Sequence, residues 1–144
     1  MNKYIIDANV LFSALISGKE IFIKLFENNL FYAPDFILIE LDKYKSVVLN
    51  KSKLPIDYLQ DFIQRVFKQI TVIPELYITD DNKKKAIVLC QDIDIKDTAY
   101  IALSLEMDLP IVTRDKKLYN GLKKKGFESI ILLDELFHPK QTNI

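Results

Sequence analysis

Short apolar runs recur along the chain, and each of them predicts a buried β-strand. Five such runs lie at residues 4–6, 31–32, 71–73, 111–113 and 130–133. They do not alternate apolar with polar residues, as strands with one solvated face do. The runs are therefore typical of a parallel sheet that is covered on both faces.

Between these runs, apolar residues recur at the spacing of amphipathic helices. One helical face is traced by apolar residues at the i, i+4, i+7 and i+11 positions, namely Ile37, Leu41, Tyr44 and Val48. A second stripe covers residues 56–70 and follows Pro55, which suits a first helical turn. Further helices are predicted over about residues 19–29, 97–107 and 116–125, the last closed by Gly126.

The segment that ends near Cys90 predicts one more helix. Asp80 or Asp81 is expected to cap it, and Ala86, Ile87 and Cys90 are expected to face inward. A single cysteine excludes an internal disulfide and leaves too few thiols for a cysteine-built zinc site. We therefore expect Cys90 to be a core residue of a protein in a reducing cytosol.

The alternation of strands and helices predicts an α/β fold, a three-layer α/β/α sandwich around a central parallel sheet of about five strands. Extra helices are inserted after the second strand. With 3 glycines and 5 prolines, the chain shows no linker, so we expect a single domain over residues 1–136 and a C-terminal tail over residues 137–144. Ligands of such folds bind beyond the carboxyl ends of the strands, where the strand order reverses.

Charge and hydropathy limit where the protein acts. Basic and acidic residues number 20 each, so no global field attracts nucleic acid, and any polyanion must be held locally. Every long apolar stretch is interrupted by charge before 18 residues, and residues 1–6 lack the apolar run of a signal peptide. We expect a cytoplasmic protein with no membrane association.

Acidic residues stand at the positions where such a sheet would bind a ligand. Asp7 closes the first predicted strand and Asp115 follows the fourth, so their carboxylates should meet at one sheet edge. Asp97 begins the helix that leads into the fourth strand, where the helix N-terminus favours its charged form. Glu40 lies on the flank of its helical stripe, from which a side chain can point into a cleft.

Several carboxylates brought together repel one another, and a divalent cation removes that repulsion. Hard oxygen ligands suit Mg²⁺ or Mn²⁺, which can activate water and neutralise a phosphodiester. The only histidine is His138, so catalysis by a histidine pair is excluded. The pattern indicates metal-dependent phosphodiester hydrolysis.

Each acid also has a purely structural interpretation. Asp7 could form a turn with Ala8 and Asn9. Asp97 and Asp115 could each be an N-cap, worth about 1 kcal/mol to its helix. Glu40 could be a solvated helix residue. Only the combination of all four favours a functional site.

Three segments, in order, resemble the PIN-domain family: Tyr-Ile-Ile-Asp-Ala-Asn-Val-Leu at residues 4–11, Asp-Thr-Ala-Tyr-Ile-Ala-Leu-Ser-Leu at 97–105 and Ile-Val-Thr-Arg-Asp-Lys-Lys-Leu at 111–118. The resemblance covers nearly the whole chain. It implies that the family's four acids correspond to Asp7, Glu40, Asp97 and Asp115, with Asp42 or Asp35 as alternatives to Glu40.

The resemblance also implies a function. It implies Mg²⁺ or Mn²⁺ as cofactor, RNA as substrate and hydrolysis that leaves a 5′-phosphate. Many family members of this size are VapC-like toxins of bacterial toxin-antitoxin systems, so we expect a metal-dependent endoribonuclease with a small antitoxin protein as partner. A homodimer is a further expectation, because a neutral net charge suggests a surface made for protein.

Other residues are predicted to support this site. Asn9 and the Thr113 hydroxyl would hydrogen-bond the acids or a metal-bound water, although a turn role for Asn9 and a strand role for Thr113 explain them equally well. Asp94 would support the metal-binding acids or bind a second metal ion, although acids in loops are more often only solvated. Arg114 would grip a phosphate or pair with an acid. Among the lysines that could bind the RNA backbone, Lys116 is the preferred candidate.

The lysine runs 83–85 and 123–125 are the other candidates for an RNA-binding surface, although such runs are more often solvated helix faces. Two rival functions are weighed. One is a non-catalytic PIN-like module that binds RNA or protein. The other is a phospho-aspartate receiver domain, which the sequence disfavours because it needs an acid pair after the first strand, and Ala8 follows Asp7.

Overall fold

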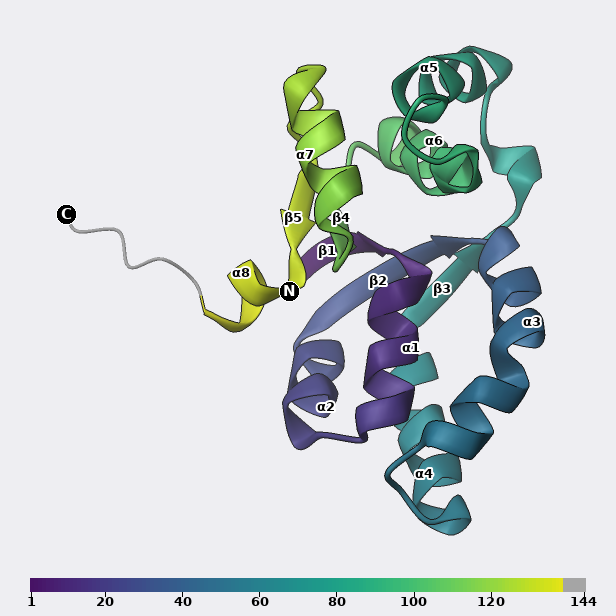
Figure 1. The fold of residues 1–144 in the computed structure, drawn as a ribbon, viewed down its shortest axis with the longest axis vertical. Helices are drawn as coiled ribbons and strands as arrows, with labels where there is room; N and C mark the ends of the chain where they lie inside the picture. Colours follow the sequence, from purple (N-terminus) through teal and green to yellow (C-terminus); the bar gives the residue numbers. More distant parts are fainter. Residues whose placement is uncertain (139–144) are drawn as a thin grey trace, which may run out of the picture.

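A computed structural model describes residues 1–138 and shows one five-stranded sheet whose strands all run parallel. The strand order is β3-β2-β1-β4-β5 (Figure 1). The strands are β1 (Asn2–Ile6), β2 (Asn29–Pro34), β3 (Ile70–Ile73), β4 (Ile111–Thr113) and β5 (Ile130–Leu132). The predicted α/β fold with a parallel sheet is confirmed.

The strand order reverses between β1 and β4. The chain first builds outward from β1 to β2 and β3, and then returns to β4 on the other side of β1. The register pairs Ile5 with Ile111 and Ile6 with Val112, so Asp7 follows β1 at the level where Thr113 ends β4. Because ligands of open α/β sheets bind at such a reversal, this edge is where a site is expected.

The first layer of helices connects β1, β2 and β3. It consists of α1 (Ala8–Ser17), α2 (Glu20–Glu27), α3 (Phe36–Lys51) and α4 (Ile56–Phe67), all on one side of the sheet (Figure 1). Helices α3 and α4 are the extra helices predicted after the second strand.

The second layer lies on the opposite side of the sheet. It consists of α5 (Asp80–Cys90), α6 (Thr98–Met107) and α7 (Lys116–Lys124) (Figure 1). The short turns η1 (Glu75–Tyr77) and η2 (Ile95–Asp97) lead into α5 and α6, and α8 (Leu133–Phe137) follows β5.

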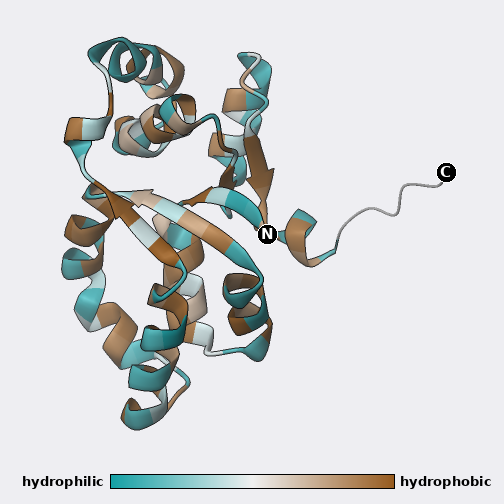
Figure 2. Cartoon of the chain, turned by 180° about the vertical axis from the view of Figure 1, so that it is seen from behind, coloured by the Kyte–Doolittle hydropathy of each residue, from teal (hydrophilic) through white to brown (hydrophobic). Residues whose placement is uncertain are grey.

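The core is continuous through the sheet. Ile5, Ile6, Ile111 and Val112 are fully buried at its centre, and α6 contacts β1 and β4 with five of its ten residues buried and the others partly buried. Along the other helices, brown and teal segments alternate because one face of each helix contacts the core and the other faces water (Figure 2).

Helix α1 was not predicted from the sequence. Its residues are apolar nearly all round, because α3, α4 and β4 cover it on several sides, and it therefore shows no clean stripe. Gly18 was the available signal, since it ends the helix at φ 62° and its N–H donates to the Ala14 carbonyl.

Two local predictions were wrong. Thr79, not Asp80 or Asp81, caps α5, because its side chain accepts from the Asn82 N–H at 3.3 Å. Ile87 is 41% exposed rather than inward.

The predicted tail is only partly described. Phe137 closes α8, and its ring packs edge-on against Phe22 with centroids 5.4 Å apart. Residues 139–144 of the tail lie outside the described residues. In the described part of the chain, every helix is too short or too polar to cross a membrane.

Candidate metal-dependent nuclease site

Asp7 occupies the carboxyl end of β1, where it is held by its neighbours on β4 and α1. Its side chain is only 6% exposed. The Thr113 hydroxyl donates to Asp7 Oδ2 at 2.8 Å, and Asn9 Nδ2 donates to the same oxygen at 3.1 Å. Asp7 is therefore fixed across the point at which the strand order reverses.

Thr113 connects the two strand ends through its one hydroxyl. It donates to Asp7 and accepts from the Asp115 backbone N–H at 3.0 Å and from Asn9 Nδ2 at 3.3 Å. Asn9 Oδ1 also accepts from the Arg114 N–H at 3.1 Å. Since a hydroxyl has one donor and two acceptor positions, every one of them is used. Thr113 and Asn9 thus support the acids.

Asp115 both caps a helix and contributes charge to the cluster. Its Oδ1 accepts from the Leu118 N–H at 3.0 Å, which is the N-cap bond of α7. The structural interpretation of Asp115 is therefore correct. It does not exclude the functional one, because the Asp115 charge also raises the pKa values of Asp7 and Asp97.

Asp97 makes no cap bond, so its structural interpretation as a side-chain cap is wrong. Its Oδ2 is buried and, within residues 1–138, has no hydrogen-bond partner. A buried polar atom without a partner costs about 1–3 kcal/mol or more if charged. Such an atom is typical of a functional site in which a ligand supplies the partner.

The carboxylates perturb one another's ionisation. The pKa of Asp97 is raised to about 8, mainly by burial and then by the charges of Asp7, Asp94, Asp115 and Glu40 in that order. The pKa of Asp7 is raised to about 6, mainly by burial, which the hydrogen bond from Thr113 opposes and to which the charges of Glu40 and Asp115 add. These four predicted acids therefore lie within electrostatic range of one another.

Glu40 is the acid on α3 that reaches this cluster. It is half-buried, as its place on the helical flank predicted, and its Oε1 accepts a short hydrogen bond from the Tyr100 hydroxyl. Asp42 is exposed, and Asp35 accepts from the Glu75 N–H at 3.2 Å. Glu40 is among the main causes of the raised pKa values of Asp7 and Asp97, and neither Asp35 nor Asp42 is, which favours Glu40 over both alternatives.

The carboxylates of Asp7, Glu40, Asp97 and Asp115 are chemically suited to a divalent cation, although they are not arranged around a single point. Within residues 1–138, no three His, Cys, Asp or Glu side chains are close enough together to hold a metal ion. Yet the donors are all carboxylate oxygens, two of them resist ionisation, and one buried oxygen is unpaired. A hard cation such as Mg²⁺ or Mn²⁺ would relieve each of these costs.

The family assignment agrees with this arrangement. The family model of the PIN domain matches residues 5–134. The chain belongs to the PIN-domain family. PIN domains are generally nucleases and typically use a divalent metal, and the predicted family resemblance is confirmed. Comparison with curated proteins found no match.

Two further predicted residues lie around this PIN-domain site. Asp94 is exposed, caps η2 by accepting from the Lys96 N–H at 3.0 Å, and raises the pKa of Asp97 from outside the cluster. Arg114 is exposed beside the strand ends, and its guanidinium donates to the Ser13 hydroxyl rather than to an acid. Within residues 1–138, Arg114 forms no ion pair.

The lysine runs do not form an open cationic surface. Lys83 and Lys85 pair with Glu75 and Asp81 at 3.0 and 3.1 Å. Lys123 pairs with Glu128 at 2.9 Å, and Lys125 pairs with Asp92. Four of the six lysines are thus paired with acids, whereas Lys84 and Lys124 are exposed and form no ion pair within residues 1–138. Lys116 is exposed at the start of α7, directly after Asp115.

Tyr100 is the site residue that the sequence analysis missed. It is 2% exposed on α6, and its hydroxyl reaches from the second helix layer to Glu40 on α3. Burial and the hydrogen bond to Glu40 raise the pKa of Tyr100, so the phenol stays protonated and remains a donor. Its position three residues after Asp97, on the same helical face, was the available signal.

Proposed function

We propose that this PIN domain is a metal-dependent endoribonuclease that hydrolyses RNA phosphodiester bonds. The observation that carries the proposal is the unpaired, buried carboxylate oxygen of Asp97 within electrostatic range of Asp7, Glu40 and Asp115. A buried acid cluster of this kind is costly for a folded protein unless a bound cation offsets the repulsion. Metal-assisted phosphodiester hydrolysis uses such a cluster.

The four acids would have different roles, which follow from the hydrogen bonds that hold each of them. Asp7, Asp97 and Asp115 would hold Mg²⁺ or Mn²⁺, and the ion, when bound, supplies charge neutralisation and an acidified water. Glu40 would complete the site and orient the attacking water, because Tyr100 holds one of its oxygens and leaves the other to accept a proton. Asn9 and Thr113 keep Asp7 in place.

The substrate would be held by charges at the rim of the site. Arg114 bears no ion pair within the described part of the chain, and Lys116 is exposed beside Asp115. Both would contact phosphates on either side of the scissile bond. Since acids pair with four of the six lysines in the two runs, binding should involve few ionic contacts and a shallow dependence on salt.

The test uses purified protein and an RNA pool with added Mn²⁺. Wild type should cleave RNA to products with a 5′-phosphate, and Asp7→Asn should abolish cleavage while the fold stays intact. Asp42→Asn is the matched control, because Asp42 is an exposed acid on α3 outside the cluster. Undiminished cleavage by Asp7→Asn would remove Asp7 from its role. No cleavage by wild type would instead favour the non-catalytic binding module.

The biological setting rests on the family resemblance alone. We propose a cytoplasmic toxin whose activity a small antitoxin protein blocks, with a homodimer as its assembly. Expression of the chain alone should arrest growth, and expression of Asp7→Asn should not. Growth equal to that of an empty vector, from a wild-type chain that is shown to be folded and present, would contradict the toxin role.

A further inference from the structure

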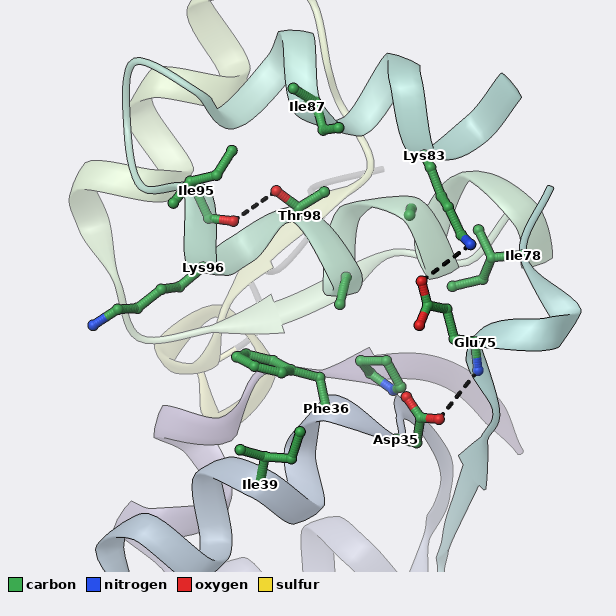
Figure 3. A pocket seen from close by; sticks show the side chains of 13 residues that line it. Asp35, Phe36, Ile39, Glu75, Ile78, Lys83, Ile87, Ile95, Lys96 and Thr98 are labelled. Atoms are coloured by element: carbon green, nitrogen blue, oxygen red, sulfur yellow. Dashed lines mark hydrogen bonds and ion pairs between the residues drawn. The ribbon is translucent and has the colours of Figure 1, made fainter. Parts of the chain in front are cut away.

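A cavity of about 530 Å³ opens between the two helix layers beside the acid cluster. Figure 3 shows it between the start of α3, the turn η1, helix α5 and the start of α6. Its volume lies in the range of small-ligand sites. None of the four acids lines it, so it is a separate compartment from the proposed metal site.

The cavity nevertheless shares a wall with the acids. Lys96 and Thr98, on either side of Asp97, both line it, and so does Ile39, which precedes Glu40. The Phe36 ring lies at its mouth (Figure 3) and meets the Tyr100 ring edge-on, with centroids 6.4 Å apart. A group bound here would therefore contact residues that directly flank Asp97 and Glu40 in the sequence.

The lining combines an apolar interior with a polar rim. Phe36, Ile78 and Ile95 provide apolar surface, and two alanines of α6, Ala99 and Ala102, also line the cavity. The rim carries both signs of charge, with the Lys83 to Glu75 ion pair at 3.0 Å and Asp35 beside it (Figure 3). Lys96 is exposed, and no acid pairs with it within residues 1–138.

We propose that this cavity receives one unstacked base of the RNA strand whose phosphodiester lies at the acid cluster. This inference rests on the proposed function. Single-stranded RNA is recognised by splayed bases that contact aromatic and apolar side chains with their faces and polar groups with their edges. The cavity offers both, and Lys96 is placed for the phosphate that joins the base to the cleavage site. An apolar side chain of a protein would make no use of the Lys96 charge, which forms no ion pair within residues 1–138.

The test compares two RNAs on the inactive Asp7→Asn protein. One is a short single-stranded oligoribonucleotide, and the other is an abasic ribose-phosphate strand of the same length. Ala99→Leu, made in the same background, fills part of the cavity with a good helix former. It should weaken binding of the intact RNA about tenfold, within the range for loss of one stacked base, and should leave binding of the abasic strand unchanged. Fluorescence anisotropy measures both affinities.

A matched pair of surface variants covers the case in which Ala99→Leu does not fold. Ile39 and Leu38 are neighbours on α3 with exposed fractions of 64% and 51%, but only Ile39 lines the cavity. Ile39→Ala should weaken binding of the intact RNA several-fold, whereas Leu38→Ala should not change it.

The outcomes separate this inference from the proposed function. If wild type cleaves RNA but the cavity variants weaken both strands equally, or neither, the base site is overturned and the function stands. In that case, the next candidate occupant of the cavity would be a side chain of a protein partner. If the Asp7→Asn protein binds neither strand, the base site and RNA as substrate are both overturned.

Discussion

The two halves of the acid cluster are built differently. Asp7 and Asp115 stand at strand ends and are fixed by hydrogen bonds from Thr113, Asn9 and the Leu118 N–H. Asp97 has no partner for one oxygen, and Glu40 is held by a single phenol from another layer. The strand-borne half is therefore pre-organised, and the helix-borne half is the part that a cation would order.

The largest effect should come from neutralising the unpaired half. Asp97→Asn removes a carboxylate whose pKa is raised to about 8, mainly by burial. The metal-free variant should therefore be more stable than the wild type at pH 8. Cleavage should fall by at least about 100-fold, because a metal ligand is lost. Thermal unfolding with a chelator and a cleavage assay measure the two effects. A lower melting temperature than wild type would mean that the carboxylate stabilises the fold rather than serving a ligand.

The stability of the metal-free protein should depend on pH for the same reason, because charging the buried acids destabilises the fold. Asp7 and Asp97 have folded-state pKa values of about 6 and about 8, raised from 3.8, so the folded state binds more protons than the unfolded state between pH 4 and 8. The free energy of unfolding of the metal-free protein should therefore fall as pH rises through that range, by a few kcal/mol at most. Denaturant titrations across this range measure it.

Two comparisons sharpen this prediction. Asp97→Asn should flatten the decline above pH 6, and Asp42→Asn should leave it unchanged. Added Mn²⁺ should raise stability most at high pH, where both acids are charged. Stability that rises with pH in the chelated protein would contradict the buried, repelling cluster.

Tyr100→Phe should have a smaller effect, because it loosens one acid without removing it. The ring and its packing against Phe36 are kept, and only the bond to Glu40 is lost. Cleavage should fall about tenfold, as loss of one hydrogen bond to a charged group predicts. In a Glu40→Gln background the same substitution should have almost no further effect. Full additivity of the two losses would show that Tyr100 acts only through the core.

The smallest effect should come from the rim. The chain has two arginines, and they form a matched pair, because Arg65 bonds Glu27 at 2.8 Å on the outer helices and Arg114 lies beside the strand ends. Arg114→Ala should raise KM several-fold and leave kcat nearly unchanged, and Arg65→Ala should change neither. Equal effects of both variants would remove Arg114 from substrate binding.

The sequence predicted the strand-borne half of the site better than the helix-borne half. Parallel strands meet at one edge, so Asp7 and Asp115 could be brought together once the strands were recognised. Glu40 could be placed only on a helical flank, because the orientation of α3 against the sheet depends on packing. The bond from Tyr100 to Glu40 joins two helix layers 60 residues apart in sequence, which no local pattern encodes.

Local errors had similar physical causes. Helix α1 lacks an amphipathic stripe because it is covered on several sides. Helix α8 has only 5 residues, which is too short for a periodic pattern to show. Thr79 was missed as the α5 cap because two acids that also favour caps follow it directly. The ion pairs of Lys83 and Lys125 connect separate elements and could not be inferred from the runs themselves, whereas the pair of Lys85 with Asp81 has the i,i+4 spacing of a single helix.

One measurement tests the central claim most directly: the anomalous scattering of Mn²⁺ in crystals of the wild-type protein soaked with that ion. The account predicts a peak bounded by carboxylate oxygens of Asp7, Asp97 and Asp115, with the unpaired oxygen of Asp97 among the ligands. Manganese bound only elsewhere, or the four carboxylates unchanged and without an ion at high Mn²⁺, would contradict it.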